Sequence, residues 1–244
     1  MSEIFSFSKL GAYDDCPRRY WFSYIKKIRV PPNKFMKDGI IFHKFADNFF
    51  KKMDSDFLER HGVEYLETLK TGDKWQNNFV DFEVKRYNIL KSHGLQHLYI
   101  PKMTERSLTG EVAGVKIRGI IDRVDERRDG GFEVIDYKPK PPFKDDKLKR
   151  QLVLYAELAS EVYDIEINHY GAYFYKTGTI WPTDETKGNK IHPASRRALE
   201  RFITNTVNKI ENDDDFYPRY GSLCNYCGYK DKCLSVQIND EDFE

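Results

Sequence analysis

The chain has 244 residues, long enough to bury a substantial core without disulfide support, and this length predicts one large domain or one domain with an appended lobe. Its 40 Lys and Arg residues against 39 Asp and Glu residues leave a net charge of +1, so no overall basic character indicates a nucleic-acid partner. No apolar run approaches a membrane span and the first residues do not form a secretory signal, so we expect a cytoplasmic protein without a membrane partner.

The first part of the chain is predicted to be helical. A helix over residues 6–28 has Ser8 as a candidate N-cap and is interrupted near Pro17, because proline breaks the backbone hydrogen-bond ladder. Apolar residues at steps of three and four predict a second helix over residues 37–53, and further helix follows over residues 63–90.

Strands begin in the middle of the chain. Three segments of alternating polarity, separated by turns, predict a β-meander over residues 107–112, 115–126 and 131–138. They are followed by a helix, a strand, a short hairpin extension and a last helix, over residues 147–163, 165–176, 179–182 and 193–212. This order of elements predicts an α/β fold with a mixed central β-sheet flanked by helices.

The second and third predicted strands each carry an aspartate, Asp122 and Asp136. If Arg127 pairs with Gly131 across a three-residue loop, which we favour, the two carboxylates lie directly opposite each other. A two-residue turn would instead put them on different faces of the sheet. Facing carboxylates destabilise a strand pair unless a cation such as Mg²⁺ or Mn²⁺ lies between them, and Lys138 on the same face could then orient a water. The simpler alternative is a pair of solvated strand residues.

The four cysteines are Cys16, Cys224, Cys227 and Cys233, the last three in a C-x2-C-x5-C pattern. Four thiolates with none left over match the ligand count of an Fe–S cluster or a structural zinc, and the spacing does not decide between the two. Two disulfides would also use four cysteines, but the chain has no secretory signal. We therefore expect a metal or cluster site that joins the two ends of the chain.

A basic stretch follows the third predicted strand. Its cations could contact phosphate groups, although such a stretch is often only a solvated loop; they are Lys140, Lys144, Lys147, Lys149 and Arg150.

Together these segments resemble the PD-(D/E)XK nuclease superfamily, in particular RecB-type and Cas4-like exonucleases with a four-cysteine Fe–S cluster. Residues 119–122 resemble its G-x-x-D segment, residues 136–138 its D-x-K segment, and residues 151–155 its Q-x-x-x-Y segment. His43 matches the upstream histidine, and the cysteines match the cluster ligands. The resemblance extends over residues 6–233.

The resemblance implies a role for each matching residue. The divalent metal would be held by His43, Asp122, Asp136 and the backbone carbonyl of Tyr137. Lys138 would position the attacking water, while Gln151 and Tyr155 would hold Lys138 or the DNA backbone. The four cysteines would bind a structural [4Fe–4S] cluster.

The resemblance also implies a domain organisation, with a restriction-endonuclease-like core at 31–212. This core would carry a helical insertion at about 54–102, which is longer than expected for a compact Cas4-like protein. An Fe–S lobe would combine residues 1–30 with 213–236, and an acidic tail would follow at 237–244.

Three functional hypotheses remain open. The first is a metal-dependent DNA exonuclease that acts on single-stranded ends with Mg²⁺ or Mn²⁺. The second is a DNA-end-binding or assembly module of a recombination or CRISPR-adaptation complex, in which cleavage is secondary. The third is a protein held together by zinc that has no nuclease role.

Overall fold

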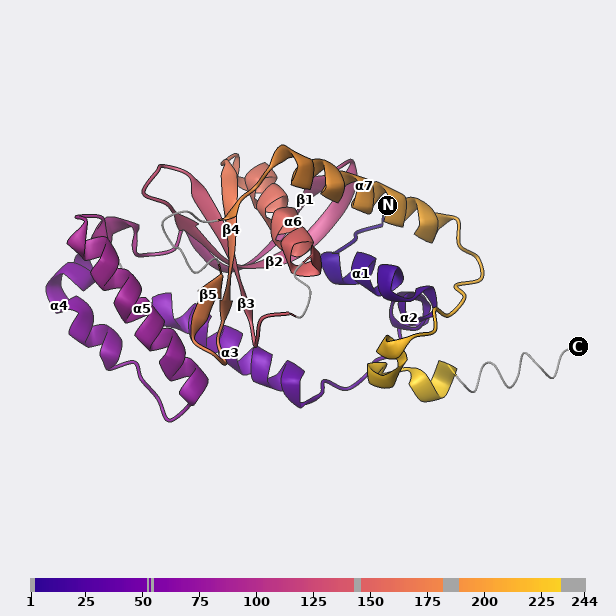
Figure 1. The fold of residues 1–244 in the computed structure, drawn as a ribbon, viewed down its shortest axis with the longest axis horizontal. Helices are drawn as coiled ribbons and strands as arrows, with labels where there is room; N and C mark the ends of the chain where they lie inside the picture. The colour runs from indigo at the N-terminus through magenta and orange to yellow at the C-terminus, as the bar shows by residue number, and fades with distance from the viewer. Residues whose placement is uncertain (1–2, 52, 54, 143–145, 182–188, 234–244) are drawn as a thin grey trace, which may run out of the picture.

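The computed structural model describes residues 3–51, 53, 55–142, 146–181 and 189–233. The predicted acidic tail and Lys144 lie outside these residues. A mixed β-sheet stands between two layers of helices, which agrees with the predicted α/β architecture (Figure 1). None of the described helices combines the length and the apolar character that crossing a membrane requires.

The sheet has the strand order β1-β2-β3-β4-β5, and β6 also pairs with β4. The strands are β1 (Met103–Val112), β2 (Val115–Glu126), β3 (Phe132–Lys138), β4 (Ile167–Phe174), β5 (Thr179–Trp181) and β6 (Asn189–Lys190). Only the β3–β4 pairing is parallel among the described strands, and helix α6 (Asp146–Tyr163) connects these two. A parallel pair requires such a crossover because both strands run in the same direction.

The turn between β2 and β3 fixes the register of these strands. Arg127 N–H donates to the Gly131 carbonyl over 2.8 Å, and Gly130 has a φ of 82°, which suits glycine in the left-handed region. The three-residue loop is therefore confirmed and the two-residue alternative is wrong. Arg123 pairs with Ile135, and the next step of this register places Asp122 opposite Asp136.

One face of the sheet is covered by α1 (Phe7–Asp15), α6 and α7 (Pro193–Glu211), as Figure 1 shows. Apolar residues of all three helices pack with strand residues in one buried cluster, which includes Leu10, Leu152, Ile203, Ile121 and Val134. Residues 1–30 were predicted to belong to the Fe–S lobe. Because α1 contributes to this cluster, part of that segment packs into the main core.

The opposite face is covered by α3 (Lys34–Phe50) and α5 (Lys74–Ser92), with α4 (Ser55–Glu67) packed against α5. Their aromatic rings form a second buried cluster with the strands, which includes Phe42, Phe79, Tyr137 and Tyr173. The region predicted as a helical insertion, which also contains η2 (Gln96–Leu98), thus supplies part of one layer of the fold.

Several predicted boundaries shift in the structure. The first predicted helix is divided into α1, α2 (Pro17–Tyr20) and a π-helix, η1 (Trp21–Ile25). Its N-cap is Ser6 and not Ser8, because the Ser6 hydroxyl accepts the Lys9 N–H at 3.1 Å. Strand β1 begins at Met103 and not at residue 107, which lengthens its pairing with β2.

The C-terminal segment packs on the helices at the start of the chain. It contains η3 (Ser222–Tyr226), and the rings of Tyr229 and Phe22 stack with centroids 5.3 Å apart. Phe216 stacks on Tyr20 at 5.9 Å, so the two ends of the chain share an apolar contact. This contact brings Cys16 close to the three C-terminal cysteines.

Candidate functional site

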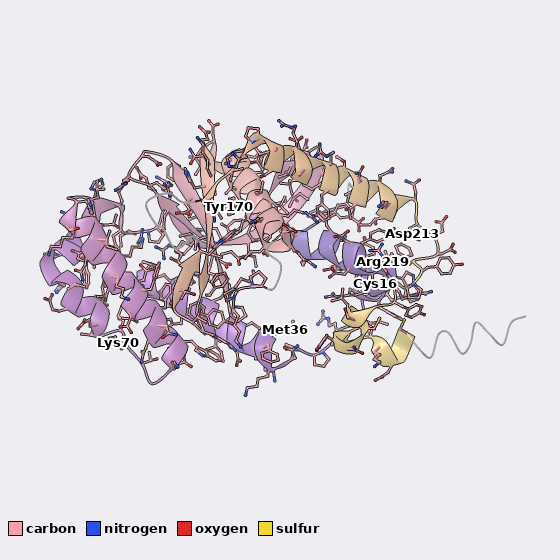
Figure 2. The ribbon with its side chains drawn as sticks, viewed as in Figure 1. Cys16, Met36, Lys70, Tyr170, Asp213 and Arg219 are labelled. Carbon is pink, nitrogen blue, oxygen red and sulfur yellow. The ribbon has the colours of Figure 1, made fainter. Side chains whose placement is uncertain are left out.

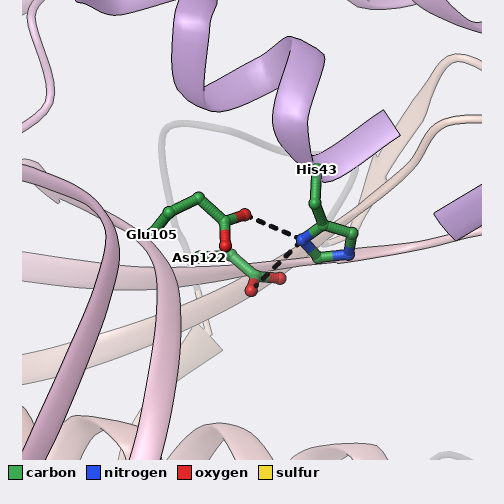
Figure 3. Close-up of side chains that lie close together, drawn as sticks. All are labelled: His43, Glu105 and Asp122. Carbon is green, nitrogen blue, oxygen red and sulfur yellow. Dashed lines mark hydrogen bonds and ion pairs between the residues drawn. The ribbon is translucent and has the colours of Figure 1, made fainter. Parts of the chain in front are cut away.

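Three side chains from different elements meet where α3 packs against β1 (Figure 3). His43 of α3 contacts Glu105 of β1 and Asp122 of β2 through its Nδ1 atom, which lies 2.8 Å from Glu105 Oε1 and 3.5 Å from Asp122 Oδ1. One nitrogen and two carboxylate oxygens lie within 4.8 Å of one another, close enough to bind one ion. A mixed oxygen and imidazole set of this kind can hold a divalent cation. We refer to these residues as the acidic triad.

Glu105 was missed in the sequence analysis, although the sequence contained a signal for it. The turn from β1 to β2 is formed by Ala113 and Gly114, with φ values of 53° and 73°, as in a two-residue type I′ turn. This turn pairs Val112 with Val115, and counting back along both strands puts Glu105 opposite Asp122. Because the predicted strand began at residue 107, the count stopped before it reached the glutamate.

The Asp122 carboxylate is buried and bound to the backbone of the neighbouring strand. Its Oδ2 atom accepts the N–H of Tyr137 at 2.7 Å. Burial and then the negative charge of Asp136 raise the pKa of Asp122 to about 8, against the opposing charges of His43 and Lys138. The carboxyl groups of Asp122 and Asp136 thus disfavour each other's ionisation, and a cation bound between them would relieve this repulsion.

Asp136 lies beside the acidic triad, and its partners are Lys138 of the same strand and Gln151 of α6. Lys138 Nζ is 2.5 Å from Asp136 Oδ2, and the Gln151 side-chain amide donates to Asp136 Oδ1 at 3.3 Å. The same amide donates to the Tyr155 hydroxyl at 3.0 Å. The structure thus places Asp136, Lys138, Gln151 and Tyr155 in one cluster near Asp122. The compact ligand group, however, contains Glu105 where the prediction had Asp136.

The negative charges of the cluster favour the protonated, cationic forms of His43 and Lys138. Burial lowers the pKa of His43, but the hydrogen bond with Glu105 and the charges of Asp122, Glu105 and Asp136 outweigh it and raise the pKa to about 9. Burial likewise lowers the pKa of Lys138, and the charges of Asp136 and Asp122 reverse this effect and raise it. Lys138 is thus a cation at neutral pH and can neutralise charge on a bound anion.

The four cysteines are all free thiols and line one cavity of about 90 Å³ between the two ends of the chain. Figure 2 shows Cys16 and Arg219 together at this end of the molecule, and the Arg219 N–H donates to the Cys16 sulfur at 3.3 Å. No three of the four sulfurs, all of which the structure describes, lie within 4.8 Å of one another. The cavity thus brings together cysteines from both ends of the chain.

The basic stretch predicted to contact DNA is largely engaged within the protein. Lys147 binds both carboxylate oxygens of Asp15 at 2.9 Å, and Arg150 lies 3.6 Å from Asp14 and over the ring of Phe202. Lys149 lies over the ring of Trp181, and Lys140 is exposed. The ion pairs connect α6 to α1, which gives Lys147 and Arg150 a structural role.

Comparisons with known proteins bear on the family and the fold of the chain. No curated protein matches the chain. A crystal structure from Eubacterium rectale named "Putative exonuclease" has a similar fold, with a TM-score of 0.51 and 11% identity over 92% of this chain and 87% of that one. The crystal structure of SSO0001 has 15% identity and a TM-score of 0.36 over 82% of this chain and 98% of that one. The model of the PD-(D/E)XK nuclease superfamily matches residues 4–234. The chain therefore belongs to the PD-(D/E)XK nuclease superfamily.

Proposed function

We propose that this protein is a metal-dependent DNA exonuclease that hydrolyses phosphodiester bonds from single-stranded ends. The observation that carries the proposal is the acidic triad of His43, Glu105 and Asp122, whose ligand atoms lie within 4.8 Å of one another. The triad lies beside Asp136 and Lys138, which stand in the segment that resembles the D-x-K segment of this superfamily, and this supports the proposal.

The triad and Asp136 would hold Mg²⁺ or Mn²⁺, with the Tyr137 carbonyl as a further ligand. Carboxylate oxygens suit both ions, and the buried Asp136 Oδ2 contacts Lys138 without receiving a properly directed hydrogen bond, so it retains capacity to bind a cation. Such an ion, when bound, lowers the pKa of a water and neutralises charge on the phosphate.

The residues around the metal position have separable tasks. The Lys138 ammonium group contacts Asp136, and it would donate a hydrogen bond to the attacking water or to a phosphate oxygen. Gln151 holds the Asp136 carboxylate through its amide, which keeps this oxygen from rotating away, and it also fixes the Tyr155 hydroxyl. Gln151 and Tyr155 therefore act as positioning residues in this proposal.

The test is the digestion of an end-labelled single strand in the presence of Mg²⁺, Mn²⁺ or EDTA, beside a circular single strand of the same sequence. We expect metal-dependent shortening of the linear strand only. Asp122→Asn should abolish the product, whereas the matched variant Glu126→Gln, which changes an exposed acid at the end of the same strand, should retain it. Full activity in Asp122→Asn would exclude the proposal, and retention of DNA without product would favour the end-binding module.

We also propose that the four cysteines bind a structural [4Fe–4S] cluster, as in RecB-type and Cas4-like exonucleases. The support is this resemblance together with the single cavity that all four cysteines line. One zinc ion would use the same four thiolates, so the metal content decides between the two. Protein purified without oxygen should contain iron and sulfide in equal amounts and absorb broadly in the visible range. A colourless protein with one zinc per chain would refute the cluster assignment.

A further inference from the structure

The N-terminal half of α3 carries an exposed surface that the site described above does not use. Met36 and Ile40 precede His43 at steps of four and three residues, so the three side chains lie on one row of the helix. The side chain of Met36 is 56% exposed and that of Ile40 is 64% exposed. This apolar row leads directly to the acidic triad.

A second row lies beside the first on the same helix. Lys37, Ile41 and Lys44 follow the same spacing, and Ile41 is 59% exposed. Both lysines are exposed, and neither forms an ion pair with any residue that the structure describes. The acid in this half of α3, Asp38, is instead within 3.5 Å of Lys176. The surface thus combines apolar side chains with cations that have no acidic partner in the described part of the chain.

The position of these two rows connects the cysteine cavity with the acidic triad. Val30 packs against the C-terminal segment, since a Cβ on Gly228 would meet it at 2.7 Å, and only residues 31–33 separate it from α3. Figure 2 shows Met36 at the end of α3 that points toward Cys16 and Arg219. The surface therefore begins at the cysteine end of the molecule and finishes at His43.

The chemistry of the two rows fits one kind of occupant. A strand with unpaired bases presents apolar base faces and, beside them, a line of phosphates. Proteins hold unpaired bases against aromatic or apolar side chains and contact the phosphates with cations. A duplex keeps its base faces stacked inside, so it would leave Met36 and Ile40 without a partner. Exposed apolar side chains that lie together, as those of Met36, Ile40 and Ile41 do, mark an interaction surface.

We infer that the two rows of α3 form a track on which an unpaired nucleic-acid strand lies as its end reaches the acidic triad. Bases rest on Met36 and Ile40, and Lys37 and Lys44 contact the phosphates. This inference rests on the proposed nuclease function for the direction of the strand, and it adds a substrate-binding surface outside the metal site.

The experiment measures the binding of fluorescent oligo-dT by anisotropy in EDTA, so that no cleavage occurs. The double variant Met36→Gln, Ile40→Gln keeps good helix formers on exposed positions, and Ile89→Gln is the matched control because Ile89 is 48% exposed on α5. We expect the double variant to bind oligo-dT about tenfold or more weakly, the scale of lost base stacking. The control should bind as the wild type does, and weak binding of a blunt duplex should be the same for all three.

The two rows can be separated by a second variant, Lys37→Gln, Lys44→Gln. It should weaken the binding of single strand and duplex alike and reduce the dependence of the affinity on salt. An oligo-U probe in the same assay reports whether RNA also occupies the track. Circular dichroism of each variant checks that α3 remains folded.

Several results would overturn the inference. One is that the Met36→Gln, Ile40→Gln variant binds oligo-dT with an affinity within twofold of the wild type. Another is that this variant loses as much affinity for the duplex as for oligo-dT. A third is a wild-type protein that binds no strand and forms a dimer that the same variant dissociates, which would assign the surface to a second copy of the chain. Oligo-dT binding that the variants weaken, without metal-dependent cleavage by the wild type, would refute the nuclease proposal and leave the track in place. Normal cleavage by the wild type, with oligo-dT binding unchanged in the variants, would refute the track and leave the nuclease proposal in place.

Discussion

The replacement Glu83→Gln tests a buried ion-pair network directly behind the acidic triad. Glu83 of α5 and Arg123 of β2 are both 0% exposed, and Arg123 Nη1 lies 2.5 Å from Glu83 Oε1. Arg123 also binds Asp125 at 2.7 Å, and Arg86 lies 3.1 Å from the other oxygen of Asp125. Since Arg123 follows Asp122 in the chain, this network holds the strand that carries the ligand.

The size of the effect follows from the burial. The variant keeps the shape of the side chain but leaves two guanidinium groups against the single carboxylate of Asp125 in the core. Removing one partner of a buried pair costs about 3–5 kcal/mol in the free energy of unfolding. For a chain of this length, each kcal/mol changes Tm by roughly 2–4 °C, so we expect a decrease of roughly 6–20 °C.

Urea and thermal denaturation followed by far-UV circular dichroism measure this effect. The control is Asp81→Asn, which removes one partner of the exposed ion pair between Lys70 Nζ and Asp81 Oδ1, 2.7 Å apart. This pair is solvated and screened, so its loss should leave the denaturation midpoint close to that of the wild type. Equal midpoints for Glu83→Gln and Asp81→Asn would show that the buried charges do not stabilise the fold as argued.

Three further predictions concern the two candidate centres. Glu105→Gln should weaken Mn²⁺ binding roughly tenfold or more, measured by calorimetry, because it removes one charged donor of the acidic triad. Metal binding should strengthen as the pH rises toward 8–9, since the proton on Asp122 (pKa about 8) and that on His43 (pKa about 9) must leave before these groups can bind the ion. Calorimetry at about pH 6, below both pKa values, and at about pH 8.5, between them, would refute this if the affinities were equal. Cys16→Ala should abolish the iron content and make the C-terminal segment more sensitive to protease, because it removes the one cysteine ligand from the N-terminal end; unchanged iron content would contradict the shared site.

The hairpin was predicted well because its geometry is local. The loop before Gly131 needs a left-handed residue at Gly130, and this requirement sets which residues of β2 and β3 face each other. The same reasoning at Ala113 and Gly114 would have identified Glu105, had the strand been extended far enough toward its start. Short-range turn chemistry therefore contained most of the information about the carboxylates of the site.

The sequence by itself determined the α/β order of elements, the pairing of β2 with β3 and the four cysteines as a set, because these depend on residue types and on contacts between neighbours in the chain. Only the tertiary structure decided that α3 brings His43 to Glu105, and that α6 turns Gln151 toward Asp136 and ties Lys147 to Asp15. Such contacts join residues that are between 15 and 132 positions apart in the chain. They depend on how whole helix faces pack on the sheet, which the spacing of apolar residues along one segment does not specify.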